Sequence, residues 1–87
     1  MEPEIILTDA QESDLRNRFG YHKPATDEHR QSIAYSREDF HRMARRLTAL
    51  RPPGREAALA ITNLEQAAFW ANAAIARSWG PAEPFGA

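Results

Sequence analysis

REAALAITNLEQAAFWANAAIAR, residues 55–77, is the stretch that decides the fold. It contains no glycine or proline, and alanine, its commonest residue, has the highest helix propensity, so it predicts a helix of roughly 34 Å. One apolar stripe along this helix consists of Ile61, Leu64, Ala68, Ala71, Ile75 and Trp79. A second stripe beside it consists of Ala60, Ala67, Trp70 and Ala74, with Asn63 among them. Because two stripes are more than one partner helix covers, we expect this helix to pack against its own chain and against other copies.

Two further helices are expected before this stretch. Thr8 followed by Gln11 is a capping-box pattern, and Gly20 marks an end, which predicts a short helix over residues 9–19. Thr26 is a second N-cap, and apolar residues at three-and-four spacing continue that helix to about Leu50. They are Ile33, Phe40, Met43, Leu47 and Leu50.

The connection between the two long helices is short, because Pro52-Pro53-Gly54 ends the first of them. The predicted fold class is therefore all-α: a short N-terminal helix followed by a long antiparallel helical hairpin that assembles as a homo-oligomer. We expect a flexible N-terminus over residues 1–7, one helical-hairpin domain over residues 8–79 and a flexible tail over residues 80–87.

Length and composition favour self-association. A chain of 87 residues buries little core and, with no cysteine, it lacks disulfides to compensate. The net charge of −1 provides no field that would attract DNA or RNA. The apolar run 5–7 is too short for a membrane span or a signal peptide, so we expect a cytoplasmic protein with no membrane partner.

Catalytic and metal-binding patterns are absent from the sequence. His22, His29 and His41 have no metal-ligand spacing, and no glycine-rich phosphate loop is present. No nucleophile has an evident base and orienting partner. We therefore expect no enzymatic activity, no cofactor and no metal. We expect Asn63 and Asn72 to satisfy one another or a backbone group across an interface.

A loop and one arginine provide the most suggestive chemistry. Residues 21–25 cannot be regular helix because of Pro24, and they present an aromatic ring, an imidazole and a cation. A guanidinium grips phosphate and a phenol ring stacks on a base, so Tyr21 with Arg37 could form a minimal nucleotide clamp. Alternatively, Tyr21 only packs between helices. Arg42, Arg45 and Arg46 form either a solvated helix face or a nucleic-acid surface.

Several segments together resemble a known family. They are Phe19-Gly-Tyr21-His22-Lys-Pro24, Pro52-Pro53-Gly-Arg55-Glu56, Ala60-Ile-Thr62-Asn-Leu64-Glu65 and Trp70-Ala71-Asn72-Ala73-Ala74-Ile75-Ala76-Arg77. In these the chain is similar to the phage anti-CBASS cyclic-nucleotide sponges, whose helical hairpin is shared with the anti-Thoeris sponges. The resemblance covers roughly residues 19–77, and the chain is too short for the β-rich portion of the longer relatives.

The resemblance implies a phage counter-defence protein in the cytoplasm of an infected bacterial host. Such proteins sequester cyclic dinucleotide and cyclic trinucleotide immune messengers without cleaving them, so that the CBASS effector is not activated. The family forms hexamers with dinucleotide pockets between pairs of protomers and separate trinucleotide pockets where three protomers meet.

The family's binding residues can be carried over to matching positions. The resemblance implies that Tyr21 stacks on a base and that Phe19, His22 and Pro24 shape the dinucleotide pocket. Arg37 takes the phosphate-gripping position, although it lies one residue further from Tyr21 than is usual, and Lys23 is the alternative. Arg77 would serve the trinucleotide pocket. The rival hypothesis from a different class is a protein–protein adaptor without a small ligand; a messenger-degrading enzyme is another.

Overall fold

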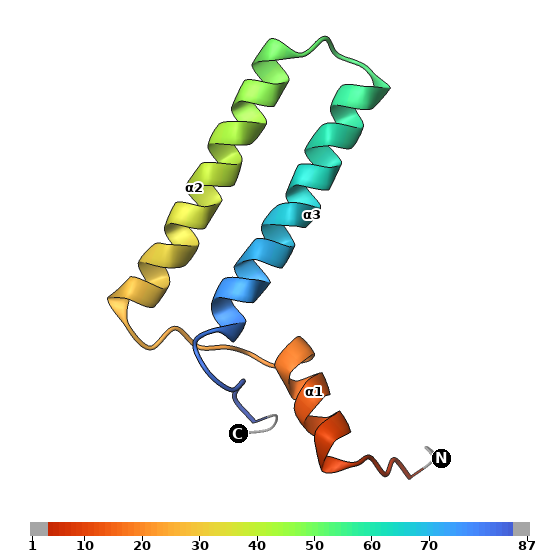
Figure 1. Ribbon diagram of the computed structural model, residues 1–87, viewed down its shortest axis with the longest axis vertical. Helices are drawn as coiled ribbons and strands as arrows, with labels where there is room; N and C mark the ends of the chain where they lie inside the picture. Colours follow the sequence, from red (N-terminus) through yellow and green to blue (C-terminus); the bar gives the residue numbers. More distant parts are fainter. Residues whose placement is uncertain (1–3, 85–87) are drawn as a thin grey trace.

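The computed structural model describes residues 4–84, and these contain three helices and no strand. The helices are α1 (Asp9–Phe19), α2 (Asp27–Leu50) and α3 (Arg55–Arg77). The predicted all-helical class is therefore confirmed. Figure 1 shows α2 and α3 side by side and antiparallel, joined at a tip, whereas α1 lies apart at the opposite end. None of the helices in residues 4–84 combines the length and apolar character needed to cross a bilayer.

Local sequence signals set the helix starts. In α1 the Thr8 backbone N–H donates to Gln11 Oε1 at 3.0 Å, and the Gln11 N–H donates to Thr8 Oγ1 at 3.1 Å, which completes the predicted capping box. In α2 the hydroxyl of Thr26 accepts a 3.1 Å bond from the His29 N–H. Each cap satisfies a backbone donor that has no partner within its own helix.

The first stripe of α3 is the one that faces α2. All six of its members, from Ile61 to Trp79, are half-buried, and they meet a half-buried face of α2. That face consists of His29, Ser32, Ile33, Ser36, Phe40, Ala44 and Leu47. Two apolar residues that the spacing also placed on α2, Met43 and Leu50, lie outside the contact and are 53% and 65% exposed. The second stripe of α3 is exposed along its length, with Trp70 at 71%.

The single chain is elongated and has almost no buried core. Its Cα radius of gyration is 17.8 Å, whereas a compact domain of this length has about 12 Å. Within the described range, Ala82 is the only buried residue. Two packed helices cannot bury the apolar surface that this sequence carries, so much of it remains exposed.

The segment after α3 returns to the loop between α1 and α2. Gly80 has a φ of +127°, a conformation that glycine adopts readily, and the chain reverses there. The Glu83 N–H then donates to the Tyr21 carbonyl at 2.9 Å, and Ala82 packs beside Gly20. The described part of the predicted flexible tail thus contacts the rest of the molecule. Residues 1–3 and 85–87 of the two predicted flexible ends lie outside the described residues.

Candidate functional site

A hollow of about 510 Å³ lies at the open end of the hairpin, where the loop meets the start of α2 and the end of α3. This volume is within the usual range of small-molecule sites, about 300–1,000 Å³. Ten residues line it: Tyr21, His22, Pro24, Arg30, Ile33, Arg37, Asn72, Ala73, Ala76 and Trp79. The antiparallel hairpin explains the grouping, because it places the first turns of α2 opposite the last turns of α3.

Four of the residues predicted for the dinucleotide pocket line this hollow together: Tyr21, His22, Pro24 and Arg37. The phenol ring of Tyr21 is accessible, since the residue is 64% exposed. Phe19 and Lys23 do not line the hollow; Phe19, the last residue of α1, is 75% exposed. In the single chain, the alternative phosphate contact Lys23 therefore lies outside the space that Arg37 lines.

His22 holds the loop in position. Its Nδ1 lies 3.1 Å from the Gly80 carbonyl and its Nε2 lies 2.9 Å from the Asn17 carbonyl. Carbonyl oxygens only accept, so whichever ring nitrogen carries a proton donates it to its neighbour. The imidazole thus lies between the end of α1 and the chain reversal after α3 and donates to one of the two carbonyls through its N–H, which positions the backbone next to Tyr21.

His29 stacks on Trp79, one of the residues that line the hollow. Their rings are stacked, with centroids 4.9 Å apart and an angle of 12° between the planes. The Nδ1 atom of His29 accepts a 3.1 Å bond from the Ala25 N–H, so the other ring nitrogen carries the proton of the neutral form. The stack joins the first turn of α2 to the residue that follows α3, and Trp79 presents the rest of its surface to the hollow.

Two guanidinium groups supply the positive charge of the hollow. Arg30 pairs with Asp27 at 3.0 Å, but both side chains are mostly exposed, and such a pair is weak. Arg37 has no ion-pair partner among residues 4–84. It is therefore the cation best placed to meet an anionic ligand, because no carboxylate must be displaced first.

Asn72 contributes an unsatisfied polar atom. Its Oδ1 is buried and has no hydrogen-bond partner within the described structure, although the residue lines the hollow. Buried polar atoms are nearly always paired, so this exception needs an explanation. Asn63, which the sequence grouped with Asn72, instead donates to the Leu59 carbonyl of its own helix at 2.8 Å.

Arg77 lies in a second, separate hollow of about 360 Å³. Arg16 and Asn17 of α1 also line it, and it shares no lining residue with the first hollow. The Arg77 guanidinium donates to the Arg18 carbonyl at the end of α1, at 3.4 Å. The predicted trinucleotide residue is thus placed apart from the predicted dinucleotide residues.

Sequence reasoning missed six of the ten lining residues of the first hollow, among them Arg30, Asn72 and Trp79. The signal was present in the spacing, because Arg30, Ile33 and Arg37 share one face of a helix. Antiparallel pairing brings that face opposite residues 72–79. The potential metal ligands remain dispersed: no cluster of three or more occurs within residues 4–84.

The fold and the hollows define a class of protein: a helical hairpin with an open, partly basic hollow of ligand size at its base. A family profile described as "Acb2/Tad1, hairpin domain" matches residues 11–76, well over half of the chain. The chain belongs to this family, which is the anti-CBASS and anti-Thoeris sponge hairpin family, so the resemblance read from the sequence is confirmed. Comparison with curated proteins and with solved structures gave no match.

Proposed function

We propose that this protein binds cyclic oligonucleotide immune messengers and holds them intact, which prevents activation of the CBASS effector in the infected host's cytoplasm. Family membership supports a phage cyclic-nucleotide sponge role. The observation that carries the proposal for this chain is the grouping of an exposed phenol ring, Tyr21, with a guanidinium that has no described ion-pair partner, Arg37, around one hollow.

The ligand class follows from the chemistry of that hollow. Aromatic stacking contributes roughly 1–3 kcal/mol per base, and a guanidinium binds phosphate oxygens through two parallel bonds. A cyclic dinucleotide is close to two-fold symmetric, so two protomers related by a two-fold axis offer it one Tyr21 and one Arg37 from each side. Nanomolar binding corresponds to about −12 kcal/mol, and two such sets in a desolvated seam can approach it.

We propose that the binding form is a homo-oligomer, with a hexamer as the family's form. The exposed second stripe of α3 and the neighbouring Phe69 (65% exposed) support this. The chain has an accessible surface of 7498 Å², whereas a compact monomer of its mass has about 5,200 Å². The excess is of the order that obligate interfaces bury.

The second hollow supports a separate trinucleotide site. Arg16 and Arg77 give it two cations within one chain, and a three-fold seam would repeat them three times around a ring-shaped anion. The assignment of trinucleotides to this hollow and dinucleotides to the first is part of the proposal.

Calorimetry with a panel of cyclic dinucleotides and trinucleotides tests the proposal. We expect at least one dinucleotide to bind at nanomolar concentration and Tyr21→Ala to weaken that binding at least a hundredfold. Tyr35→Ala is the matched control, because Tyr35 is equally exposed, at 62%, but does not line the hollow.

Two results would overturn the proposal. If no member of the panel binds to the correctly folded protein, the adaptor hypothesis is favoured instead. If chromatography of the denatured complex recovers linear or hydrolysed nucleotide, the protein is an enzyme rather than a sponge.

A further inference from the structure

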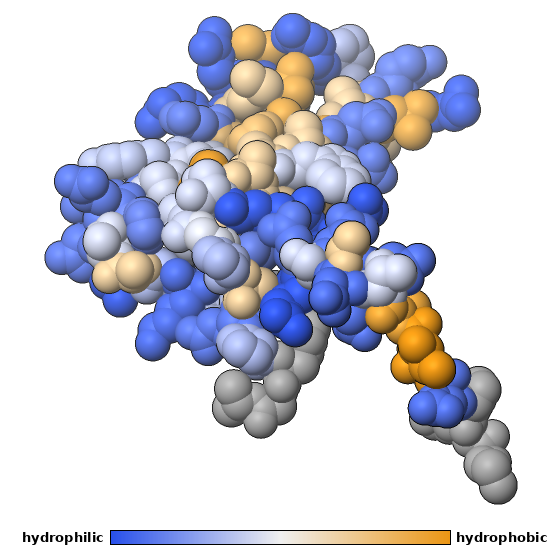
Figure 2. All heavy atoms as spheres, turned by 60° about the horizontal axis from the view of Figure 1, so that its bottom comes forward, coloured by the Kyte–Doolittle hydropathy of each residue, from blue (hydrophilic) through white to orange (hydrophobic). Residues whose placement is uncertain are grey.

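The N-terminal arm, residues 4–14, is both acidic and apolar. It contains four carboxylates, Glu4, Asp9, Glu12 and Asp14, and no lysine or arginine. Ile5 and Ile6 in this arm are 74% and 81% exposed. Figure 2 shows an apolar strip on the arm that projects from the rest of the surface and ends in a hydrophilic group. Residues 4–10 also precede the region that the family profile matches.

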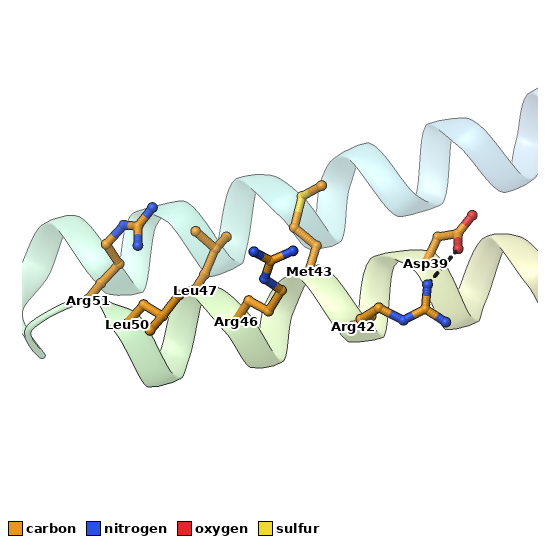
Figure 3. A pocket seen from close by; sticks show the side chains of 7 residues that line it. All are labelled: Asp39, Arg42, Met43, Arg46, Leu47, Leu50 and Arg51. Carbon is orange, nitrogen blue, oxygen red and sulfur yellow. Dashed lines mark ion pairs between the residues drawn. The ribbon is translucent and has the colours of Figure 1, made fainter.

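The tip of the hairpin, residues 42–55, has the opposite charge. It contains five arginines and no carboxylate: Arg42, Arg45, Arg46, Arg51 and Arg55. A hollow of about 410 Å³ lies along α2 at this tip, lined by three of these arginines together with Asp39, Met43, Leu47 and Leu50. Figure 3 shows guanidinium and apolar side chains interspersed along the helix.

Within residues 4–84, apolar side chains of the tip hollow stay exposed and two of its arginines have no carboxylate partner. Its apolar floor includes Met43 and Leu50, which are 53% and 65% exposed. Its one ion pair in the described structure is Arg42–Asp39 at 3.5 Å, so Arg46 and Arg51 have no described carboxylate partner. The arm and the tip lie at opposite ends of a molecule 53 Å long, so an arm cannot reach its own tip (Figure 1).

We propose that the N-terminal arm of one copy docks on the hairpin tip of a second copy. Ile5 and Ile6 cover Met43 and Leu50, while the arm carboxylates Glu4, Asp9 and Glu12 face Arg46 and Arg51. Each partner supplies what the other lacks: apolar side chains without cover, and charges of opposite sign without a described partner. The opposed charges guide the encounter and fix the register, and the apolar contact provides the burial.

The contact is head-to-tail, because the arm and the tip are different surfaces. Such contacts close into rings or continue as open chains, according to the rotation between neighbours. The proposal does not depend on nucleotide binding, and its test uses the protein without a ligand.

Because the sequence contains no cysteine, only introduced cysteines can form disulfides in a trapping experiment. Ile6→Cys in one sample and Leu50→Cys in a second, isotope-labelled sample are mixed and oxidised, and mass spectrometry measures the mixed disulfide. Ile6→Cys with Tyr35→Cys is the matched control, because Tyr35 is on the same helix as Leu50 and is 62% exposed. We expect at least fivefold more disulfide with Leu50→Cys than with Tyr35→Cys, and Met43→Cys provides a second tip position if Leu50→Cys fails to fold.

Charge reversal tests the electrostatic part. Arg46→Glu on the tip copy is expected to lower the disulfide yield at least threefold, and Glu12→Lys on the arm copy is expected to restore most of it. Equal yields for Leu50→Cys and Tyr35→Cys would overturn the proposal. It would also fail if Arg46→Glu leaves the disulfide yield unchanged but abolishes binding of a short RNA, because the tip would then be a nucleic-acid surface.

Discussion

The imidazole of His29 lies flat against the indole of Trp79, with ring centroids 4.9 Å apart. This pair closes the open end of the hairpin, since His29 is in the first turn of α2 and Trp79 follows the last turn of α3. The Ala25 N–H bond to His29 extends the same link to the loop. The site is therefore positioned by side chains from both arms of the hairpin, the start of α2 and the residues that follow α3, rather than by one helix.

We expect His29→Ala to lower the free energy of unfolding by about 1–2 kcal/mol, because it removes an aromatic pair worth about 0.5–1.5 kcal/mol and the Ala25 bond. Urea unfolding at a fixed protein concentration measures the change, since self-association makes stability depend on concentration. His41→Ala is the matched control, because His41 is exposed on the same helix and should change stability by less than about 0.5 kcal/mol. Equal losses would show that the stack contributes nothing specific.

Gly20→Ala should disturb the contact between the loop and the segment after α3. A Cβ at this position would lie 2.5 Å from the Arg16 carbonyl oxygen and 2.7 Å from the Ala82 Cβ. Gly20 has a φ of −80°, so the requirement for glycine comes from close approach rather than from a left-handed cap. We expect faster hydrogen exchange at the Glu83 N–H, which bonds to Tyr21. Adding Ala82→Gly should partly restore protection, because it removes one of the two clashes.

Most of the fold follows from local signals, and the site does not. The capping box of Thr8 and Gln11 can be predicted from four consecutive residues. The first stripe of α3 can be predicted from the spacing of its apolar residues alone. Spacing could not distinguish Leu47, which faces α3, from Leu50, which is exposed, because both follow the same three-and-four pattern.

The missing part of the site depends on contacts between distant segments. Arg30 and Asn72 reach one hollow only because the hairpin places residues 30–37 opposite residues 72–79. The approach of Ala82 to Gly20 depends on the reversal at Gly80 and has no marker in the local sequence. A surface that covers the exposed second stripe of α3 would belong to another copy of the chain. The oligomer therefore stays a prediction.

Asn72→Leu should separate stability from binding. The Asn72 Oδ1 is buried without a described partner, and leucine has a similar size without the polar atom, so we expect stability to stay equal or rise by about 1 kcal/mol. We expect affinity for the bound nucleotide to fall at least tenfold, because the amide is then unable to meet a polar group of the ligand. Unfolding and calorimetry on one preparation measure both. Asn63→Leu is the control, and a stability loss in Asn72→Leu with unchanged affinity would contradict the prediction.

Arg37→Gln and Lys23→Gln distinguish the two candidate phosphate contacts. Arg37 lines the hollow and has no described ion-pair partner, whereas Lys23 lies outside it. We expect Arg37→Gln to weaken dinucleotide binding at least tenfold, or about 1.4 kcal/mol, and Lys23→Gln to change it less than threefold. Arg37→Lys should recover only part of the affinity, because an ammonium lacks the planar fork of a guanidinium. The reverse order of effects would assign the contact to Lys23.

Arg77→Gln should affect trinucleotides alone, because Arg77 and Tyr21 line hollows that share no residue. The substitution removes one of two cations from the second hollow and the bond to the Arg18 carbonyl, which lies at the surface. We expect trinucleotide affinity to fall at least tenfold while dinucleotide affinity stays within twofold, as measured by calorimetry with each ligand. Arg16→Gln tests the other cation of the same hollow and should act in the same direction. If Arg77→Gln weakens both ligands equally while size-exclusion chromatography shows an unchanged oligomer, the two hollows belong to one site.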